Sequence, residues 1–142
     1  MRLTRYTDYA MRVLIYLGAQ PGRVCSIAEI AQAYGVSRNH LMKVAHDLSK
    51  AGYIEGVRGR TGGIRLARPA AKINVGDVVR RTEPDFDLVE CGSCVIAPAC
   101  ALTGVMDEAL AAFMAVLDRY TLADMLVKQS KLMRLFKLPP AS

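Results

Sequence analysis

The feature that most constrains the fold is a pair of short helical segments separated by a four-residue turn. Ser26-Ile-Ala-Glu29 has the form of a capping box, in which serine and glutamate side chains satisfy the free amides at a helix start. Apolar residues then recur at helical spacing up to Gly35, a residue type common at helix ends. Ser37 can cap a further helix that runs to the break at Ala51-Gly52. Two helices joined by Tyr34-Gly-Val-Ser37 predict a helix-turn-helix.

The hydrophobic period changes from helical to alternating after this break. Tyr53 to Val57 and Ile64 to Leu66 are predicted strands, and the glycine-rich segment Gly59 to Gly63 is the turn between them. This hairpin would be the wing of a winged helix-turn-helix. The expected fold is therefore mainly α with a small β-hairpin.

Helical patterns also flank the predicted hairpin and helix-turn-helix. A first helix is predicted after Thr7 and ends near Gly18. A short helix begins at Asn74 and is closed by Pro84. The chain from Gln129 onward is expected to be weakly ordered.

The longest helical pattern runs from Leu102 to Tyr120, and its apolar residues extend beyond one face. The helix is therefore expected to pack on two sides. Because a small domain offers only one core, the second side is expected to meet a partner chain. The predicted parts are a winged helix-turn-helix DNA-binding domain (1–83), a cysteine-bearing loop (84–100), a dimerisation helix region (101–127) and a C-terminal tail (128–142).

The positive charge of the chain is concentrated in its first half. The chain has a formal net charge of +6, whereas its first 68 residues carry eleven basic and four acidic side chains, a net +7. This distribution indicates a polyanionic partner, although a basic face also suits a membrane surface or solubility.

Two predicted elements carry side chains suited to double-stranded DNA. The first turns of the second helix in a helix-turn-helix reach base edges in the major groove, and the glycines of the hairpin allow a close approach to DNA. The candidate DNA-binding residues are Ser37, Arg38, Asn39, His40, Lys43, Arg58, Arg60 and Thr61. The alternative for the helix alone is an ordinary solvated face, but clustered arginines around the hairpin, Arg65 and Arg68 included, favour DNA binding.

Three of the four cysteines, Cys91, Cys94 and Cys100, fall within ten residues of a segment without periodicity. Thiolates bind soft iron and zinc, so these three can close around one metal centre. A structural zinc site needs a fourth ligand, and both histidines lie in the recognition-helix segment. The alternatives are a disulfide between Cys91 and Cys94, or inert thiols. Cys25 is expected to be a small buried hydrophobe.

No segment is expected to span a membrane, and the N-terminus, although it imitates a signal peptide, is not expected to be one. The longest apolar run, Ala109 to Leu117, is far shorter than the ~18 residues that a membrane-spanning helix requires. Asp8 and Arg12 interrupt the apolar stretch near the N-terminus. A cytoplasmic protein is expected, in which thiols stay reduced and clustered cysteines indicate metal or redox chemistry.

Two other classes of protein compete with a regulator that carries a sensor. A thiol oxidoreductase would use Cys91-Gly-Ser-Cys94, but this motif does not follow a strand in a βαβ context. No nucleophile and base pair, phosphate loop or paired carboxylates indicate another enzyme. A DNA-binding module with inert cysteines is the second alternative.

Several segments together resemble the Rrf2 family of winged-helix repressors, and within it the members that sense nitric oxide. The resemblance covers the chain to about Val127. The segments that carry it are Met1-Arg-Leu-Thr-Arg-Tyr-Thr-Asp-Tyr-Ala10, Tyr34-Gly-Val-Ser-Arg-Asn-His-Leu41, Val57-Arg-Gly-Arg-Thr-Gly-Gly-Ile-Arg-Leu66, Gly76-Asp-Val-Val79, Ile96-Ala-Pro-Ala-Cys100 and Tyr120-Thr-Leu-Ala-Asp124.

The resemblance implies a homodimeric repressor. Its iron-sulfur form would bind a palindromic operator, and it would release the DNA when nitric oxide reacts with the cluster. Cys91, Cys94 and Cys100 would hold the cluster. Asp8 of the partner subunit would be the fourth ligand, and Arg12 would orient its carboxylate.

Two details bear on the kind of cluster that this resemblance implies. The family usually has more residues between the first two cysteines than the two found here, so both a four-iron (4Fe–4S) and a two-iron (2Fe–2S) cluster stay open. A redox or iron sensor of the same family with a different cluster is the matching alternative function. Thr103 stands where family members that regulate cluster assembly have a histidine, which argues against that sub-type.

Overall fold

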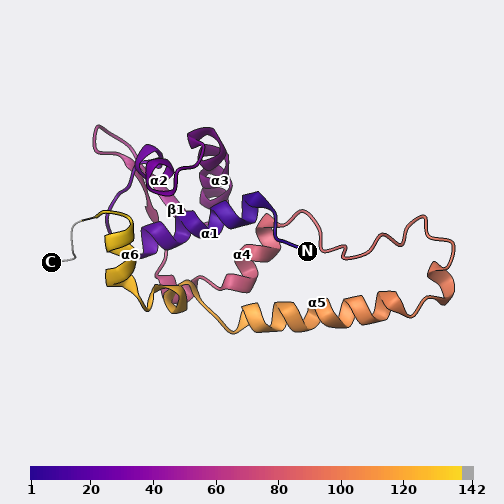
Figure 1. The fold of residues 1–142 in the computed structure, drawn as a ribbon. Helices are drawn as coiled ribbons and strands as arrows, with labels where there is room; N and C mark the ends of the chain where they lie inside the picture. Colours follow the sequence, from indigo (N-terminus) through magenta and orange to yellow (C-terminus); the bar gives the residue numbers. More distant parts are fainter. Residues whose placement is uncertain (139–142) are drawn as a thin grey trace.

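The helix at the start of the chain forms the centre of the core. In the computed structural model, which describes residues 1–138, α1 (Arg5–Gly18) lies between the other helices of the body (Figure 1). The predicted start after Thr7 was wrong by about one turn, because Thr4 is the N-cap and its side chain accepts a hydrogen bond from the Thr7 amide. The fully buried apolar residues of this helix are Ala10, Val13, Leu14, Tyr16 and Leu17.

The predicted helix-turn-helix is confirmed. The structure contains α2 (Ile27–Tyr34) and α3 (Arg38–Lys50), and both hydrogen bonds of the capping box between Ser26 and Glu29 are present. Gly35 has a φ of 66°, the left-handed conformation that glycine adopts readily at a helix end. Ser37 occupies the N-cap position of α3, but its side chain makes no capping hydrogen bond, so that part of the prediction was wrong.

The predicted wing is also confirmed as a two-stranded antiparallel hairpin. β1 (Ile54–Val57) pairs with β2 (Gly63–Leu66), with Ile54 opposite Leu66. Backbone hydrogen bonds of 2.8 Å in both directions between Cys25 and Ile64 attach β2 to the linker between α1 and α2. A Cβ atom at Gly63 would collide with the Cys25 carbonyl, so this close approach requires glycine.

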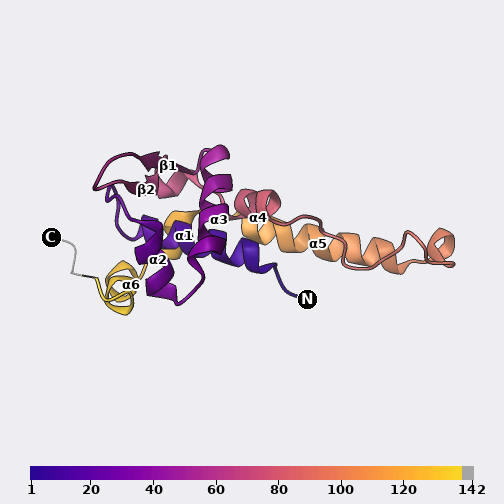
Figure 2. The ribbon, with the colours of Figure 1, turned by 90° about the horizontal axis from the view of Figure 1, so that it is seen from above.

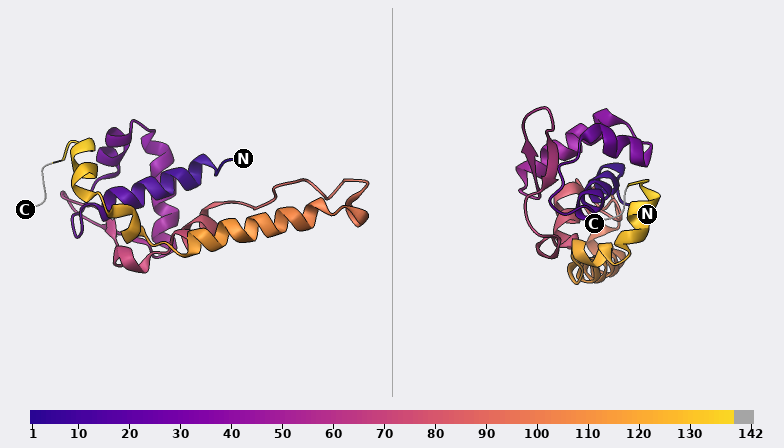
Figure 3. Two further views of the ribbon diagram at one scale, coloured as in Figure 1. Left: turned by 60° about the horizontal axis from the view of Figure 1, so that its bottom comes forward. Right: turned by 90° about the vertical axis from the view of Figure 1, so that its left-hand side faces the viewer.

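After the wing, a 3-10 turn η1 (Ala70–Lys72) leads into α4 (Val75–Thr82), which Asn74 caps as predicted. The chain then leaves the body as a loop that contains a 3-10 turn η2 (Ala97–Ala99), and it returns along α5 (Leu102–Asp118). Figures 1 and 3 show the loop and α5 running side by side as an arm that projects from the body. We call residues 84–118 the arm and residues 84–100 the cysteine loop.

The base of the arm is fixed to α4. The two Asp118 carboxylate oxygens accept hydrogen bonds of 2.6 and 2.7 Å from Arg80, and the Asn74 amide donates to the Asp118 carbonyl at 2.8 Å. Only Met114 of α5 is buried, so the expectation that one side of this helix packs on the core of its own chain was too strong. The large apolar side chains left exposed along α5 and just after it are Leu102, Val105, Val116 and Tyr120.

The segment from Gln129, predicted to be weakly ordered, begins with a helix, so this prediction was wrong for α6 (Gln129–Leu135). A 3-10 turn η3 (Leu122–Leu126) leads to it, and the Gln129 side chain donates to the Ala19 carbonyl at 2.6 Å. The Phe136 ring lies 4.9 Å from that of Tyr16 and 5.3 Å from that of Tyr34. A two-turn helix gives too short a pattern for a periodicity argument, and long-range aromatic contacts stabilise it. The last four residues of the predicted tail lie outside the described residues.

Within residues 1–138, the structure contains no helix that is both long and apolar enough to cross a membrane.

Phe136→Ala is expected to lower the free energy of unfolding by about 2 kcal/mol, because it removes a half-buried ring from two aromatic partners. The matched control is Leu135→Ala, since Leu135 is 67% exposed and should change stability little. Urea unfolding of both variants measures the difference. Equal effects of the two substitutions would contradict the packing of α6 on α1 and α2.

Candidate DNA-binding surface and cysteine loop

The candidate DNA-binding residues of the recognition helix lie at the exposed start of α3. Ser37 is the N-cap, and Arg38, Asn39, His40 and Lys43 occupy the first two turns with exposed side chains. The opposite face of α3 is buried through Leu41, Val44, Ala45 and Leu48. The core therefore fixes which face of the helix is presented to a ligand.

The candidate residues of the wing lie at its tip. Arg58, Arg60 and Thr61 are exposed between the two strands. A Cβ atom at Gly62 would collide with the Val57 carbonyl, and Gly59 has a φ of 116°, so the tight tip depends on both glycines. Figures 1 and 2 show this hairpin and α3 as neighbours in the body, well away from the far end of the arm.

Two further arginines that suggested DNA binding in the sequence have partners within the fold. Arg65 forms an exposed ion pair of 2.8 Å with Glu55 on the facing strand. Arg68 lies over the Tyr53 ring at 4.9 Å and donates to the Gly52 carbonyl. Arg58 and Arg60 are thus the better candidates for phosphate contacts.

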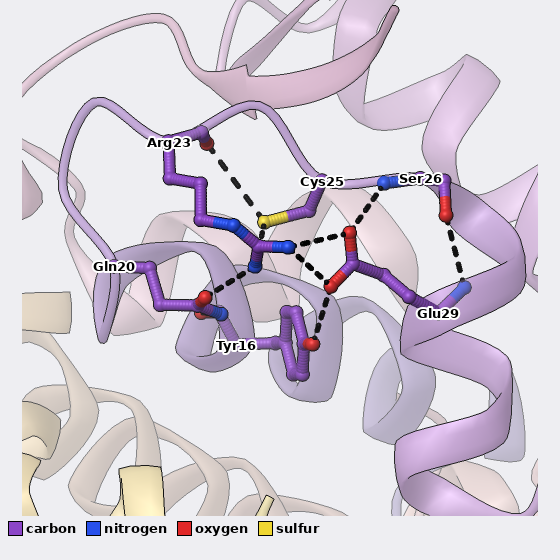
Figure 4. A network of polar contacts seen from close by, with 6 residues as sticks. All are labelled: Tyr16, Gln20, Arg23, Cys25, Ser26 and Glu29. Atoms are coloured by element: carbon purple, nitrogen blue, oxygen red, sulfur yellow. Dashed lines mark hydrogen bonds and ion pairs between the residues drawn. The ribbon is translucent and has the colours of Figure 1, made fainter. Parts of the chain in front are cut away.

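A polar network that the sequence did not predict joins α1 to the start of α2 (Figure 4). Glu29 accepts hydrogen bonds from the Tyr16 hydroxyl at 2.8 Å and from Arg23 at 3.0 and 3.1 Å, in addition to its capping bond with Ser26. Burial alone would raise the pKa of Glu29, but these hydrogen bonds and the Arg23 charge lower it. The only signal in the sequence was the capping box, which does not identify Arg23 as a partner.

Cys25 lies inside this network and is fully buried, which confirms the expectation for this residue. Arg23 donates to its sulfur at 3.4 Å. Burial raises the pKa of the Cys25 thiol to about 11, and the nearby Arg23 charge only partly opposes this effect. Cys25 is therefore a packed thiol of the body, separate from the cysteines of the arm.

The cysteine loop turns with a three-residue period. The Cys94 amide donates to the Cys91 carbonyl at 3.2 Å, the Ala97 amide to the Cys94 carbonyl at 3.2 Å, and the Cys100 amide to the Ala97 carbonyl at 3.4 Å. Ala97–Ala99 forms a 3-10 turn within this segment, and Cys91 and Cys94 precede it in ordinary turns. These hydrogen bonds fold the segment that carries the three cysteines into a compact loop.

The three loop thiols suit a soft metal centre by their chemistry. All are free; Cys94 is exposed, and Cys91 and Cys100 are half-buried. The Cys91 sulfur lies 3.3 Å from the Thr103 hydroxyl of α5, and Cys91 is one of the residues that line a cavity of about 590 Å³ between the loop and α5. Within the described part of a single chain, no three Cys, His, Asp or Glu side chains converge on one metal-sized point. Three thiolates are suitable ligands for iron, and the three thiols would have to move closer together to bind one metal centre.

Asp8 and Arg12 form a pair on α1, in the body of the protein. Arg12 contacts both Asp8 carboxylate oxygens at 3.0 Å. The Arg12 guanidinium also lies 5.8 Å from the Tyr9 ring and 5.7 Å from the Tyr34 ring. The Tyr9 ring is 6.2 Å from His40 of the recognition helix. The structure thus brings Asp8 to Arg12, and Arg12 to the helix-turn-helix, but within one chain Asp8 does not join the loop thiols.

Comparison with known proteins relates the whole chain to one group of regulators. Residues 3–128 match the sequence pattern of the Rrf2 family, described as "Iron-dependent Transcriptional regulator". The chain is 51% identical to the HTH-type transcriptional regulator NsrR of Bacillus subtilis (strain 168), over 97% of this chain and 99% of that protein.

Solved structures show the same relation. The structure of T. potens IscR is similar with a TM-score of 0.76 and 28% identity, over 93% of this chain and 90% of the other. The structure of CymR, the global cysteine regulator of B. subtilis, is similar with a TM-score of 0.70 and 27% identity, over 88% of this chain and 95% of the other.

The metal-free protein at pH 8 is expected to react with a thiol reagent at three cysteines and to spare Cys25. With a pKa of about 11, only about one Cys25 thiol in a thousand is ionised at this pH, and the thiolate is the reactive form. Mass spectrometry of the labelled peptides before and after unfolding measures this. Rapid labelling of Cys25 in the folded protein would contradict its buried position.

Proposed function

Because the chain belongs to the Rrf2 family of transcriptional regulators, we propose that it is a cytoplasmic DNA-binding repressor that holds an iron-sulfur cluster and releases its operator in response to nitric oxide. The observation that carries the proposal is the division of the molecule. Exposed side chains suited to bases and phosphates lie on the body, whereas three free thiols lie on an arm joined to that body through α4. The relatives are regulators and not enzymes, so the oxidoreductase alternative is dropped.

In this proposal, α3 reads bases and the wing contacts the DNA backbone. Arg38 and Asn39 can bond base edges, with arginine suited to guanine and asparagine to adenine. Ser37, His40 and Lys43 lie on the same exposed start of the helix and can contact bases or phosphates. Arg58, Arg60 and Thr61 at the hairpin tip would hold phosphates or enter the minor groove.

The exposed apolar residues of α5 support a homodimer. Val105 and Val116 are 57% and 44% exposed on a helix that its own body covers at one end only. A second copy of the same helix would remove these side chains from water, as is common at two-fold interfaces. Two recognition helices related by this axis would bind a palindromic operator with half-sites about one helical turn apart.

Cys91, Cys94 and Cys100 would hold the cluster, with Asp8 of the partner subunit as the fourth ligand. When bound, the cluster supplies iron that reacts with nitric oxide. We propose a 4Fe–4S cluster, with three thiolates and one carboxylate as its four ligands. Carboxylate oxygen is a harder ligand than thiolate, so the Asp8 position would be the labile one.

Arg12 would pass the state of Asp8 to the recognition helix. It holds both oxygens of the Asp8 carboxylate and lies against Tyr9 and Tyr34, and Tyr9 lies beside His40. A change in the orientation of Asp8 would therefore move a guanidinium that packs on the helix-turn-helix. Two sites that share a packed element in this way can influence each other's affinity.

A redox or iron sensor with a 2Fe–2S cluster is the second candidate. Only two residues separate Cys91 from Cys94, and the Cys91 sulfur is held 3.3 Å from Thr103. Mössbauer spectra, iron and sulfide content, and operator binding before and after nitric oxide distinguish the two candidates. If the protein contains no iron when it is purified without oxygen, both candidates are excluded and the protein is a regulator without a sensor.

Arg58→Ala and Arg60→Ala are expected to weaken binding to all DNA sequences and to reduce the dependence of log Kd on log salt by about one for each lost phosphate contact. Arg38→Ala and Asn39→Ala are expected instead to relax base preference at a cost of ~1 to 3 kcal/mol in discrimination. Footprinting and binding titrations at several salt concentrations measure both. Equal losses of specificity in the two groups would contradict the assignment, and an asymmetric site bound by a monomer would contradict the dimer.

Cys91→Ala, Cys94→Ala and Cys100→Ala proteins purified without oxygen are expected to lose most of their iron, because each lacks one thiolate of the cluster. Cys25→Ala is the matched control and should keep its iron, since Cys25 is buried in the body.

Asp8→Ala should retain a modified cluster with a shifted Mössbauer spectrum and altered nitric-oxide kinetics. A folded but iron-free Cys25→Ala protein would overturn the ligand set, and an unchanged spectrum and rate in Asp8→Ala would exclude Asp8.

A further inference from the structure

Glu83 stands directly before the cysteine loop, and its carboxylate lies at the start of α1. The two oxygens accept hydrogen bonds from the Thr4 amide at 3.0 and 3.2 Å. One oxygen also accepts from the Thr4 hydroxyl at 2.6 Å and from the Thr7 hydroxyl. Four hydrogen bonds thus join the end of α4 to the N-terminus of a helix 76 to 79 residues away in the sequence.

This carboxylate acts as a cap for α1. The first amides of a helix lack partners within the helix, and their aligned dipoles attract negative charge. Such a charge usually comes from a neighbouring residue, but here Glu83 supplies it from another part of the chain. Thr7 is fully buried, and its hydroxyl would lose its carboxylate acceptor if Glu83 moved away. Although burial raises the pKa of Glu83, the bonds from Thr4 and Thr7 lower it, so the side chain is charged at neutral pH.

The helix turn that Glu83 caps contacts the recognition helix. The Tyr6 hydroxyl, on this turn of α1, donates to the Asp47 carboxylate of α3. Asp8, the proposed cluster ligand, follows two residues later. On the other side, α4 is bound to the end of the arm by Arg80 and Asp118. Glu83 therefore lies where the base of the arm meets the helix that touches α3.

We propose that Glu83 is a positioning residue that couples the cysteine loop to the recognition helix by capping α1. The inference deepens the proposed function and rests on it. When the cysteine loop holds the cluster, Glu83 keeps the start of α1 ordered, and the Tyr6 hydroxyl keeps its hydrogen bond to Asp47 of α3. When the loop moves, Glu83 moves with it, because Glu83 is bonded directly to Pro84, the first residue of the loop. The start of α1 then loses the carboxylate that accepts from Thr4 and Thr7, and the hydrogen bond from Tyr6 to Asp47 of α3 is weakened.

Four variants test this coupling. Glu83→Gln removes the charge with little change in size. Thr7→Val removes the buried hydroxyl but keeps the shape of the side chain, and Thr7→Ser restores the hydroxyl. Asp85→Asn is the matched control, because it removes a charge two residues from Glu83 while its oxygen can still accept from the Asp87 amide.

The first measurement is amide hydrogen exchange of the metal-free protein, which does not depend on the cluster. The backbone amides of residues 4 and 7 are expected to exchange about tenfold faster in Glu83→Gln and Thr7→Val. They are expected to exchange at the wild-type rate in Thr7→Ser and Asp85→Asn. Unchanged exchange in Glu83→Gln and Thr7→Val would show that Glu83 is not the cap and would overturn the proposal.

The second measurement is the ratio of operator affinities of the cluster-loaded and metal-free proteins. This ratio is expected to fall at least about fivefold toward one in Glu83→Gln and Thr7→Val, and to keep its wild-type value in Thr7→Ser and Asp85→Asn. A wild-type ratio in Glu83→Gln and Thr7→Val, despite faster exchange, would show a purely structural cap and overturn the coupling alone. A ratio of one in the wild-type protein would instead overturn the proposed function, and the coupling with it. If Glu83→Gln fails to fold, the comparison of Thr7→Val with Thr7→Ser decides the question.

Discussion

Burial of α1 is the constraint on which the rest of the structure depends. This helix contacts α3, α4, η3 and β2 of the wing, and its apolar side chains such as Leu14 and Leu17 are fully buried. Gly18 allows Leu122 and Leu126 of η3 to approach the end of the helix, where a Cβ atom would lie 2.8 Å from a Leu126 methyl carbon. Because a packed interior transmits displacement, a change at one end of α1 is felt by the elements around it.

Polar contacts fix the two ends of α1 to different parts of the molecule. The start of α1 is held by Glu83 from the base of the arm, and its end is held by the network around Arg23 and Glu29. The first contact faces the cysteine loop, and the second faces the helix-turn-helix. In the proposed function, a change that begins in the arm would therefore reach α1 before it reaches α3.

The arm itself has little support from its own chain. α5 is held near its C-terminal end by α4, and along the rest of its length it packs against the cysteine loop. A helix with exposed Leu102 and Val105 is costly in water, so it is expected to be covered in the functional protein. A second copy of the chain would cover it and would also bring Asp8 of the partner subunit toward the loop thiols. In this proposal, one interface provides both the dimer and the closure of the cluster site.

The sequence by itself determined the local structure. The capping box at Ser26, the glycine at position 35 and the alternation around the wing are signals that nearby residues satisfy, and all were confirmed. The family was also evident, because its motifs are local segments. Only the tertiary structure showed that α6 packs through Phe136, that Arg65 and Arg68 are engaged within the hairpin region, and that Glu83 caps α1. These contacts join residues far apart in the chain, and no periodicity or spacing records which distant side chains will meet when the core around α1 closes.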